Sequence, residues 1–318
     1  MWSIEYIVPW HVFYIAFTSP VWANMKVGSR CGYCLLHRGY KMILMSTGDE
    51  GKRREAMQGL LELLGRDFKP DAVPSVIGAE RGRVIARVTG CVDPYAGLKR
   101  ESNEAGLKML PSLRAMVEEK PPRERFRAAC LISCLGNVID YDVPGNDSDI
   151  GEAMKLLGEG FYLDDTDEFK AMIRPGSRLL FFTDNAGEIA FDTLVVEELR
   201  RLGCHVTVAV KAGPSLNDAL MGDAEAVGMT GAADEVITTG AAAIGVRLDE
   251  APKWFRDRFE SADLIMAKGM ANWETLTETP APCPLMYVFR TKCEPVATAV
   301  GVPEKRNVAF LVEKGWRL

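Results

Sequence analysis

From Arg178 onward, short apolar runs alternate with amphipathic stretches. The run RLLFF is followed by a polar turn and then by EIAFDTLVVEELRRLG, where apolar residues recur at helical spacing. Four more candidate strands follow, namely CHVTVAV, DEVITTG, DLIMAKG and LMYVF. Strands that alternate with helices form parallel sheets, because each crossover places a helix over the sheet. We therefore predict an α/β fold whose largely parallel, doubly covered sheet spans residues 171–318.

Residues 25–170 show a different pattern, which predicts a helical region packed on the sheet domain. GDEGKRREAMQGLLELLG has apolar residues at helical spacing, and we expect Gly65 to end this helix. DPYAGLKRESNEAGLKMLPSLRAMVEE predicts one long helix, or two helices bent at Pro111, and RERFRAACLISCLGNVID predicts another. Little before Pro175 has the pattern of a strand. We expect the helical region to act as a lid over a site on the sheet.

The first 24 residues are apolar and aromatic, but Glu5 and Pro9 interrupt them. A transmembrane helix needs about 20 consecutive apolar residues. A secretory signal needs a segment rich in Lys or Arg, whereas the first such residue here is Lys26. Because Met25 begins MKVGSRCGYC, we interpret residues 1–24 as a non-native upstream extension from a misassigned start codon. A membrane or export role is the alternative, and we expect no membrane association.

The formal net charge of -6 argues against a nucleic-acid partner, because nucleic-acid-binding proteins usually carry a basic face. An acidic protein can still bind phosphate locally, through a metal ion, a few lysines and helix N-termini. Eight cysteines are too few for a disulfide framework in 318 residues, so a reducing compartment is favoured. We expect a cytoplasmic protein. The sequence does not indicate its oligomeric state.

Polar clusters follow the ends of four predicted strands, where open parallel sheets bind their ligands. In the first, TDNAGE, the oxygens of Asp184 and Asn185 suit a hard cation such as Mg²⁺ or Mn²⁺. Gly187 allows close approach of the backbone, and the helix that follows offers N–H groups to an anion. Asp218, after the second strand, is placed to supply another carboxylate. The alternative for these residues is a role as helix caps.

The other two clusters contain lysines. Lys268, Gly269 and Asn272 follow the strand DLIMA, and Lys292 follows the strand LMYVF. A Lys-Gly pair suits a phosphate contact, although it also occurs in common turns. Four clusters at four successive strand ends favour one shared site over four unrelated turns.

These segments resemble the damage-control phosphatase family, long catalogued as domain of unknown function 89. The family patterns D-N-x-G-E, K-G-x-x-N-[YW]-E-x-L and K-C begin here at Asp184, Lys268 and Lys292. The family's G-x-P-x-x-N-D segment corresponds here to Gly213, Pro214, Asn217 and Asp218, with no residue between Gly213 and Pro214. In the helical half, C-x-x-C, D-P-Y-x-x-x-K, an N-E pair and G-N-x-I-D begin at Cys31, Asp93, Asn103 and Gly136. The resemblance covers residues 25–310 and is to the C-x-x-C-bearing branch common in archaea and some bacteria.

The resemblance implies that Asp184, Asn185 and Asp218 bind one divalent metal ion (Mn²⁺, Mg²⁺, Co²⁺ or Ni²⁺). The phosphate contacts that it implies come from Lys268, Gly269, Asn272 and Lys292. The implied reaction is the metal-dependent hydrolysis of a phosphomonoester, with a small phosphorylated metabolite such as a sugar phosphate or a cofactor intermediate as the substrate. We expect Lys268 and Lys292 to neutralise the phosphate with help from the N–H groups after Gly187, and Glu188 or Asp218 to orient the attacking water. Further substrate contacts are expected from Asp93, Tyr95, Asn103 and Asn137.

Two other functions stay open. A carboxyl methyltransferase that uses S-adenosylmethionine has been proposed within this family, but the chain lacks a G-x-G after the first core strand. A non-catalytic protein that binds a metal or a phosphometabolite is the second alternative, against which the intact Asp184, Asn185 and Asp218 argue.

The role of the Cys31–Cys34 pair is also open between helix packing, a second metal or active-site contribution, and redox chemistry. A closed zinc site needs four ligands; His37 follows the pair closely, and Cys91 or Cys293 would have to join in space.

Overall fold

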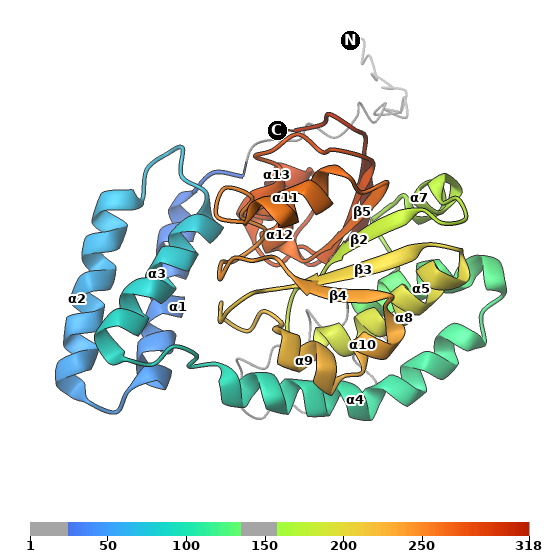
Figure 1. Cartoon of the computed structure of the whole chain (residues 1–318). Helices are drawn as coiled ribbons and strands as arrows, with labels where there is room; N and C mark the ends of the chain where they lie inside the picture. The colour runs from blue at the N-terminus through green and yellow to red at the C-terminus, as the bar shows by residue number, and fades with distance from the viewer. Residues whose placement is uncertain (1–24, 135–157, 318) are drawn as a thin grey trace, which may run out of the picture.

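The computed structural model describes residues 25–134 and 158–317. The predicted upstream extension (residues 1–24) and the predicted substrate residue Asn137 lie outside the described residues. Within them, one sheet is enclosed by helices and a group of three long helices lies at one side of it (Figure 1).

The sheet has seven strands in the order β1-β7-β6-β5-β2-β3-β4. In chain order the strands are β1 (Leu163–Asp164), β2 (Arg178–Phe182), β3 (His205–Val210), β4 (Glu235–Thr238), β5 (Leu264–Lys268), β6 (Leu285–Arg290) and β7 (Asn307–Val312). Strands β2 to β6 run parallel to one another, whereas β7 is antiparallel to β6 and β1 is parallel to β7. The predicted α/β fold with a largely parallel sheet is therefore confirmed. The sequence pattern did not indicate β7, nor β1, which precedes Pro175.

Both faces of the sheet are buried, which explains the nearly continuous apolar runs of its strands. Leu179 and Phe181 of β2 belong to one apolar core, and Leu180 and Phe182 belong to the other. The first core packs under α4, α5 and α8 (Ala96–Glu118, Pro122–Ser133 and Glu188–Arg201). The second packs under α11, α12 and α13 (Lys253–Glu260, Met270–Leu276 and Glu294–Val300). The shorter helices are α7 (Thr166–Met172), α9 (Met221–Ala226) and α10 (Met229–Ala232).

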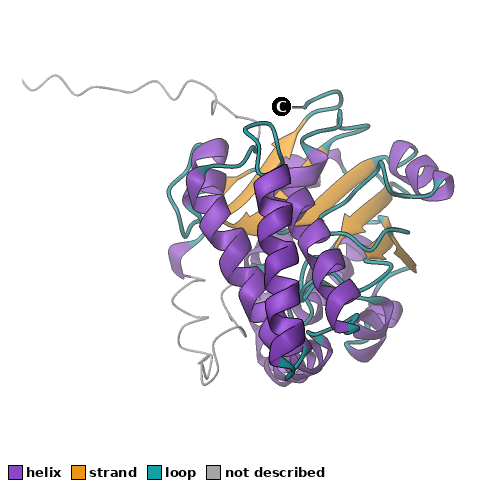
Figure 2. Cartoon of the chain, turned by 90° about the vertical axis from the view of Figure 1, so that its left-hand side faces the viewer, coloured by secondary structure: helices purple, strands orange, loops and turns teal. Residues whose placement is uncertain are grey.

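Three helices, α1 (Ser29–Ser46), α2 (Glu50–Asp67) and α3 (Pro74–Thr89), form a bundle that stands in front of the strands in Figure 2. Asp49 caps α2, because its Oδ1 accepts hydrogen bonds from the N–H groups of Gly51 and Lys52 at 2.7 and 3.0 Å. The expectation that Gly65 ends this helix is wrong, since the helix continues to Asp67. None of the described helices is long and apolar enough to cross a membrane.

The bundle contacts segments that follow the carboxyl ends of the parallel strands. A Cβ atom added at Gly78 of α3 would lie 2.9 Å from Ile244, in the loop after β4. Gly28, before α1, faces Pro295, just after β6. Helix α4 is one continuous helix with Pro111 inside it, and it leads from the bundle to α8 and α9 (Figure 1). The helical region therefore lies against the edge of the sheet where the predicted site residues are.

Candidate functional site

The loops that follow β2 and β3 are joined by backbone hydrogen bonds. The N–H of Ala219 donates to the carbonyl of Asp184 at 2.9 Å, and the N–H of Ala186 donates to the carbonyl of Asn217 at 2.8 Å. These bonds form an isolated antiparallel bridge between Asn185 and Asp218. The structure thus brings together Asp184, Asn185 and Asp218, the three residues predicted to bind a metal ion.

The carboxyl groups of Asp184 and Asp218 lie in a site where negative charge is unfavourable. Burial raises the pKa of Asp184 well above its ordinary value, and the charges of Glu188 and Asp218 raise it further. Burial likewise raises the pKa of Asp218 to about 6, although Lys211 opposes the shift. The Oδ2 of Asp218 is buried and makes no hydrogen bond to the described residues, although the ammonium nitrogen of Lys211 lies 3.6 Å from it. A positive charge placed between these carboxylates would relieve both their desolvation and their repulsion.

The Asn185 amide nitrogen contacts two carboxylates. Its Nδ2 lies 3.0 Å from Oδ2 of Asp184 and 3.5 Å from Oε2 of Glu188. The helix-cap alternative is not supported, because α8 has Gly187 as its N-cap residue and no side-chain cap. Asp218 is no cap either, since α9 begins only at Met221. These polar side chains are therefore directed to one another rather than to helix ends.

Gly269 brings its backbone against the carboxyl group of Asp184. Its φ of 82° lies in the region that favours glycine, and an added Cβ would be 2.2 Å from the Cγ of Asp184. The signal for this contact in the sequence was the glycine directly after Lys268 at a strand end. The phosphate contact of Gly269 stays a prediction.

Lys268 is fully buried, and its ammonium group faces the interior. The Nζ donates to Oε1 of Glu188 at 2.6 Å, to Oδ1 of Asp192 at 2.9 Å and to the carbonyl of Ser133 at 3.1 Å. Burial alone would lower the pKa of this lysine, but the two carboxylates outweigh burial and raise it. Burial raises the pKa of Asp192 to about 7, against the opposing effect of Lys268. All three protons of the ammonium are engaged, so its predicted phosphate contact stays a prediction.

Asn272 joins three strand ends. Its Nδ2 donates to the carbonyls of Thr183 and Lys268 at 2.9 and 2.7 Å, and its Oδ1 accepts from Lys211 at 3.1 Å. The Nζ of Lys211 also donates to the carbonyl of Gly245 at 2.6 Å and lies 3.6 Å from Asp218. In this structure Asn272 fixes the loops around the site, and its predicted phosphate contact is untested. Lys211 was not predicted as a site residue, although its place at the end of β3 was a signal.

The helical region contributes buried side chains from the first turns of α4. Lys99 lies 2.6 Å from Asp93, and its charge lowers the pKa of Asp218. Asn103 is buried between Gly187 and Asp223, so its polar atoms contact protein groups rather than an open cavity. The roles of Asp93 and Asn103 in substrate binding stay predictions. In the sequence, Lys99 is the last residue of the D-P-Y-x-x-x-K pattern that begins at Asp93.

Lys292 differs from the other lysines of the site because it is exposed. It follows β6, and its charge lowers the pKa of Asp184. An exposed ammonium group near the buried carboxylates is placed to bind an incoming anion.

The cysteine pair lies at the start of α1, next to the strand end of β6. Cys31 is buried in the same apolar core as Cys293, Cys34 is exposed, and all eight cysteines are free. Over residues 25–134 and 158–317, no three or more His, Cys, Asp or Glu side chains are arranged to hold a metal ion. The role of the pair stays open. The set predicted at Asp184, Asn185 and Asp218 contains only two residues of these types, because its third member is an asparagine.

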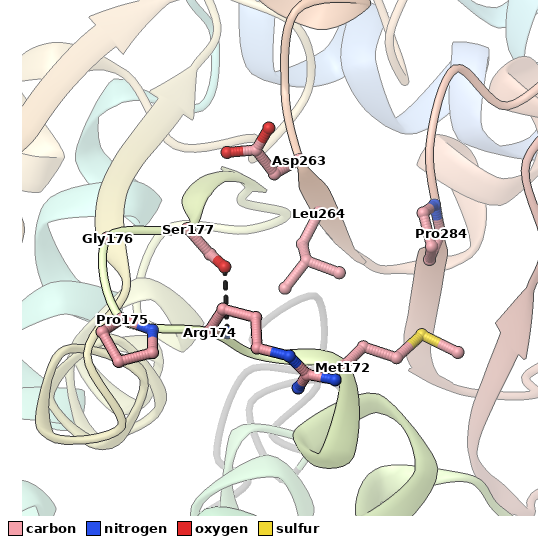
Figure 3. Close-up of a pocket in the computed structure, with 8 residues that line it drawn as sticks. All are labelled: Met172, Arg174, Pro175, Gly176, Ser177, Asp263, Leu264 and Pro284. Carbon is pink, nitrogen blue, oxygen red and sulfur yellow. Dashed lines mark hydrogen bonds between the residues drawn. The ribbon is translucent and has the colours of Figure 1, made fainter.

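A separate pocket lies at the opposite edge of the sheet (Figure 3). It is lined by the segment Met172–Ser177 before β2 and by Asp263 and Pro284 before β5 and β6. Its charged groups are engaged locally, since Asp263 pairs with Arg178 at 2.9 Å and Arg174 donates to backbone carbonyls. This pocket contains none of the predicted site residues.

Comparisons with known proteins agree over most of the chain. A model of the damage-control phosphatase ARMT1-like domain matches residues 27–308. A damage-control phosphatase of Archaeoglobus fulgidus is 34% identical over 293 residues, 91% of this chain and 100% of the relative. A damage-control phosphatase of Pyrococcus horikoshii is 31% identical over 282 residues, 88% of this chain and 96% of the relative. The crystal structure of a DUF89 family protein from Pyrococcus horikoshii is 30% identical, with a TM-score of 0.81, and covers 92% of this chain and 100% of that chain.

Proposed function

The chain belongs to the damage-control phosphatase ARMT1-like family, and we propose that it hydrolyses a phosphomonoester with one divalent metal ion bound by Asp184, Asn185 and Asp218. The relatives support a phosphatase that acts in metabolite damage control. Its substrate is a small phosphorylated metabolite. The metal dependence, the ligand set and the phosphomonoester specificity are our proposal.

The observation that carries the proposal is the pair of buried carboxyl groups at the ends of β2 and β3. Asp184 and Asp218 both have raised pKa values, and Oδ2 of Asp218 has no hydrogen-bond partner among the described residues. Nδ2 of Asn185, the positive end of the amide dipole, already contacts Asp184. Hard cations such as Mg²⁺ and Mn²⁺ prefer carboxylate, amide and water oxygens, so these residues fit such an ion.

A divalent cation bound there supplies a Lewis acid that stabilises negative charge on the phosphoryl oxygens. The chain's own residues supply orientation and further positive charge. Exposed Lys292 attracts the phosphate dianion, while Lys211 and Lys99 offset the charge of Asp218 from within the protein. Because phosphoryl transfer depends on positioning and electrostatics, these fixed charges favour the transition state.

Glu188 is proposed to hold the attacking water through the oxygen that Lys268 does not bind. Its Oε1 accepts from Lys268 at 2.6 Å, whereas its Oε2 lies on the side of Asn185. The ion pair fixes the carboxylate, so one oxygen keeps a constant direction. Asp218 is the second candidate for this role.

The proposal is tested by hydrolysis of p-nitrophenyl phosphate with the full chain after metal removal by a chelator. Mg²⁺, Mn²⁺, Co²⁺ and Ni²⁺ are titrated in parallel. We expect activity only when metal is returned, and a loss of at least about 100-fold in Asp184→Asn, because a neutral amide replaces one of the two anionic ligands of the cation. Asp167→Asn is the matched control, since Asp167 is an exposed residue of α7 paired with Lys170.

Full activity of the chelated protein would contradict the metal dependence. Unchanged activity in a folded Asp184→Asn variant would contradict the ligand set. Equal hydrolysis of bis-p-nitrophenyl phosphate, a diester, would contradict the phosphomonoester specificity.

A further inference from the structure

The side chain of Asn103 connects helix α4 to the two loops that carry the proposed metal ligands. Its Oδ1 accepts a hydrogen bond from the N–H of Gly187 at 2.7 Å, in the loop of Asp184. Its Nδ2 donates to Oδ1 of Asp223 at 2.7 Å, in α9. In Figure 1, α4 runs beside both α8 and α9, and the two hydrogen bonds of Asn103 lead to the loop before α8 and to α9.

Asp223 continues the link to the second loop. Its Oδ2 accepts from the N–H of Leu220 at 2.9 Å, two residues after Asp218. Three hydrogen bonds therefore connect the loop after β2 with the loop after β3 through two side chains. This link is independent of the backbone bonds that join the loops directly.

An amide is the side chain that fits between these groups. Gly187 presents an N–H donor on one side, and Asp223 presents a carboxylate acceptor on the other. A carboxamide has an acceptor oxygen and donor N–H groups, whereas a carboxylate only accepts. Asn103 is buried, so a mismatch at either end would leave a buried polar group without a partner.

The backbone of α4 packs closely against the loop between β2 and α8, so the position of this loop depends on α4. A Cβ at Gly187, whose φ is 80°, would lie 2.9 Å from the carbonyl oxygen of Ser102. A Cβ at Gly106 would lie 2.7 Å from the carbonyl oxygen of Gly187. Helix and loop are therefore in direct backbone contact, and Asn103 lies within this contact.

We propose that Asn103 and Asp223 are positioning residues that set the separation between Asp184 and Asp218. This inference rests on the proposed function, because the two aspartates act as metal ligands there. Asn103 then affects catalysis through the ligand loops and not through direct contact with the substrate. Because Asn103 belongs to α4 and α4 follows the bundle, a shift of the helical region would also shift the loops that carry the proposed metal ligands.

The test is an exchange of the two side chains. Asn103→Asp places two carboxylates face to face, and Asp223→Asn places two amide donors face to face. The double variant Asn103→Asp/Asp223→Asn restores all three hydrogen bonds with reversed polarity between the two side chains and keeps the net charge. We expect each single variant to weaken Mn²⁺ binding about 10- to 100-fold, as is typical when a partner of a metal ligand is lost. The double variant should return to within about threefold of the wild type, a non-additive result.

Mn²⁺ binding is measured by the electron paramagnetic resonance signal of free Mn²⁺, so the readout does not depend on turnover. Gln58→Glu and the exchange Gln58→Glu/Glu62→Gln are matched controls, because Gln58 donates to Glu62 at 3.0 Å on the exposed face of α2. These controls should leave Mn²⁺ affinity unchanged. If Asn103→Asp does not fold, the Mn²⁺ affinities of Asp223→Asn and the double variant still test the inference.

Single variants with lower melting temperatures but unchanged Mn²⁺ affinity would overturn the inference and show a role in stability alone. A folded double variant that binds Mn²⁺ no better than the single variants would overturn it as well. Absence of Mn²⁺ binding by the wild type would overturn the proposed function together with the inference. Wild-type binding with unaffected variants would overturn the inference alone.

Discussion

The ammonium nitrogen of Lys268 lies 2.6 Å from Oε1 of Glu188, and both side chains are fully buried. A second carboxylate, that of Asp192, lies 2.9 Å from the same nitrogen. One lysine thus balances two buried acids at the end of β5. These buried side chains can stay charged only because they are paired. Removal of any one of the three would leave a buried charge without one of its partners.

Replacement of Lys268 by Met should destabilise the protein strongly. Two buried carboxylates would be left without their cation, and the loss of one partner of a buried pair costs about 3 to 5 kcal/mol. The free energy of unfolding in urea measures this change. Lys253→Met is the control, because Lys253 pairs with Asp257 on the surface of α11 and should contribute less than about 1 kcal/mol. A Lys268→Met variant as stable as the control would contradict the structural role.

Replacement of Lys292 by Met should affect catalysis but not stability. Its side chain is exposed, and the loss of one charge-assisted contact of about 1.5 to 3 kcal/mol lowers kcat/KM about 10- to 100-fold. The melting temperature should stay unchanged. Steady-state kinetics with p-nitrophenyl phosphate checks this, with Lys314→Met, another exposed lysine, as the control. Wild-type kcat/KM in Lys292→Met would rule out the predicted phosphate contact.

Alternating strands and helices were sufficient to predict the parallel part of the sheet. The predicted strand Leu179–Phe182 corresponds to β2, and the others match β3 to β6 closely. β1 was not predictable, because two residues carry no periodicity and their pairing with β7 depends on tertiary contacts. Helix α2 passes Gly65 because a glycine ends a helix only when the backbone there turns left-handed. At Gly65 the helix continues instead.

The position of the site was predictable, but the direction of its side chains was not. Parallel strands end at one edge, so Asp184 and Asp218 had to be neighbours. Sequence motifs do not tell which atom faces which. The motif around Lys268 is the same whether its ammonium group points to a ligand or to Glu188. In the structure, the buried carboxylates of Glu188 and Asp192 in α8 hold the ammonium group in the interior. Lys211 was not predicted because its partners, Gly245 in a loop and Asn272 in α12, are distant from it in the sequence.

Glu274 should make stability depend on pH. Burial raises the pKa of this residue of α12 from 4.5 to about 7. The folded state therefore holds a proton that the unfolded state releases between about pH 4.5 and 7. Stability from this group is fully present below pH 4.5 and is lost as the pH rises through 7. The loss amounts to up to about 3 kcal/mol, since one unit of pKa corresponds to about 1.4 kcal/mol.

Urea unfolding of the wild type and Glu274→Gln at pH 5 and pH 8 measures this dependence. The glutamine variant lacks the titrating group, so its stability relative to the wild type should increase at the higher pH. Glu278→Gln is the control, because Glu278 is exposed and pairs with Lys26 on the surface. A constant difference between the wild type and Glu274→Gln at both pH values would exclude a raised pKa of Glu274.

Gly269→Ala should disrupt the site through contact with Asp184. The new Cβ would lie 2.2 Å from the Cγ of Asp184, so that carboxyl group has to move. A displaced ligand lowers metal affinity, and we expect Mn²⁺ binding and turnover to fall at least about 10-fold. The variant also has the cost of a backbone conformation that essentially only glycine adopts, about 1 to 3 kcal/mol. Gly315→Ala separates the two effects, because Gly315 has a φ of 85° and nothing within 4 Å of an added Cβ. Both variants should lose stability, Gly269→Ala the more because of its additional clash, but only Gly269→Ala should lose Mn²⁺ affinity. Equal Mn²⁺ affinity in the two variants would place the proposed metal site away from Asp184.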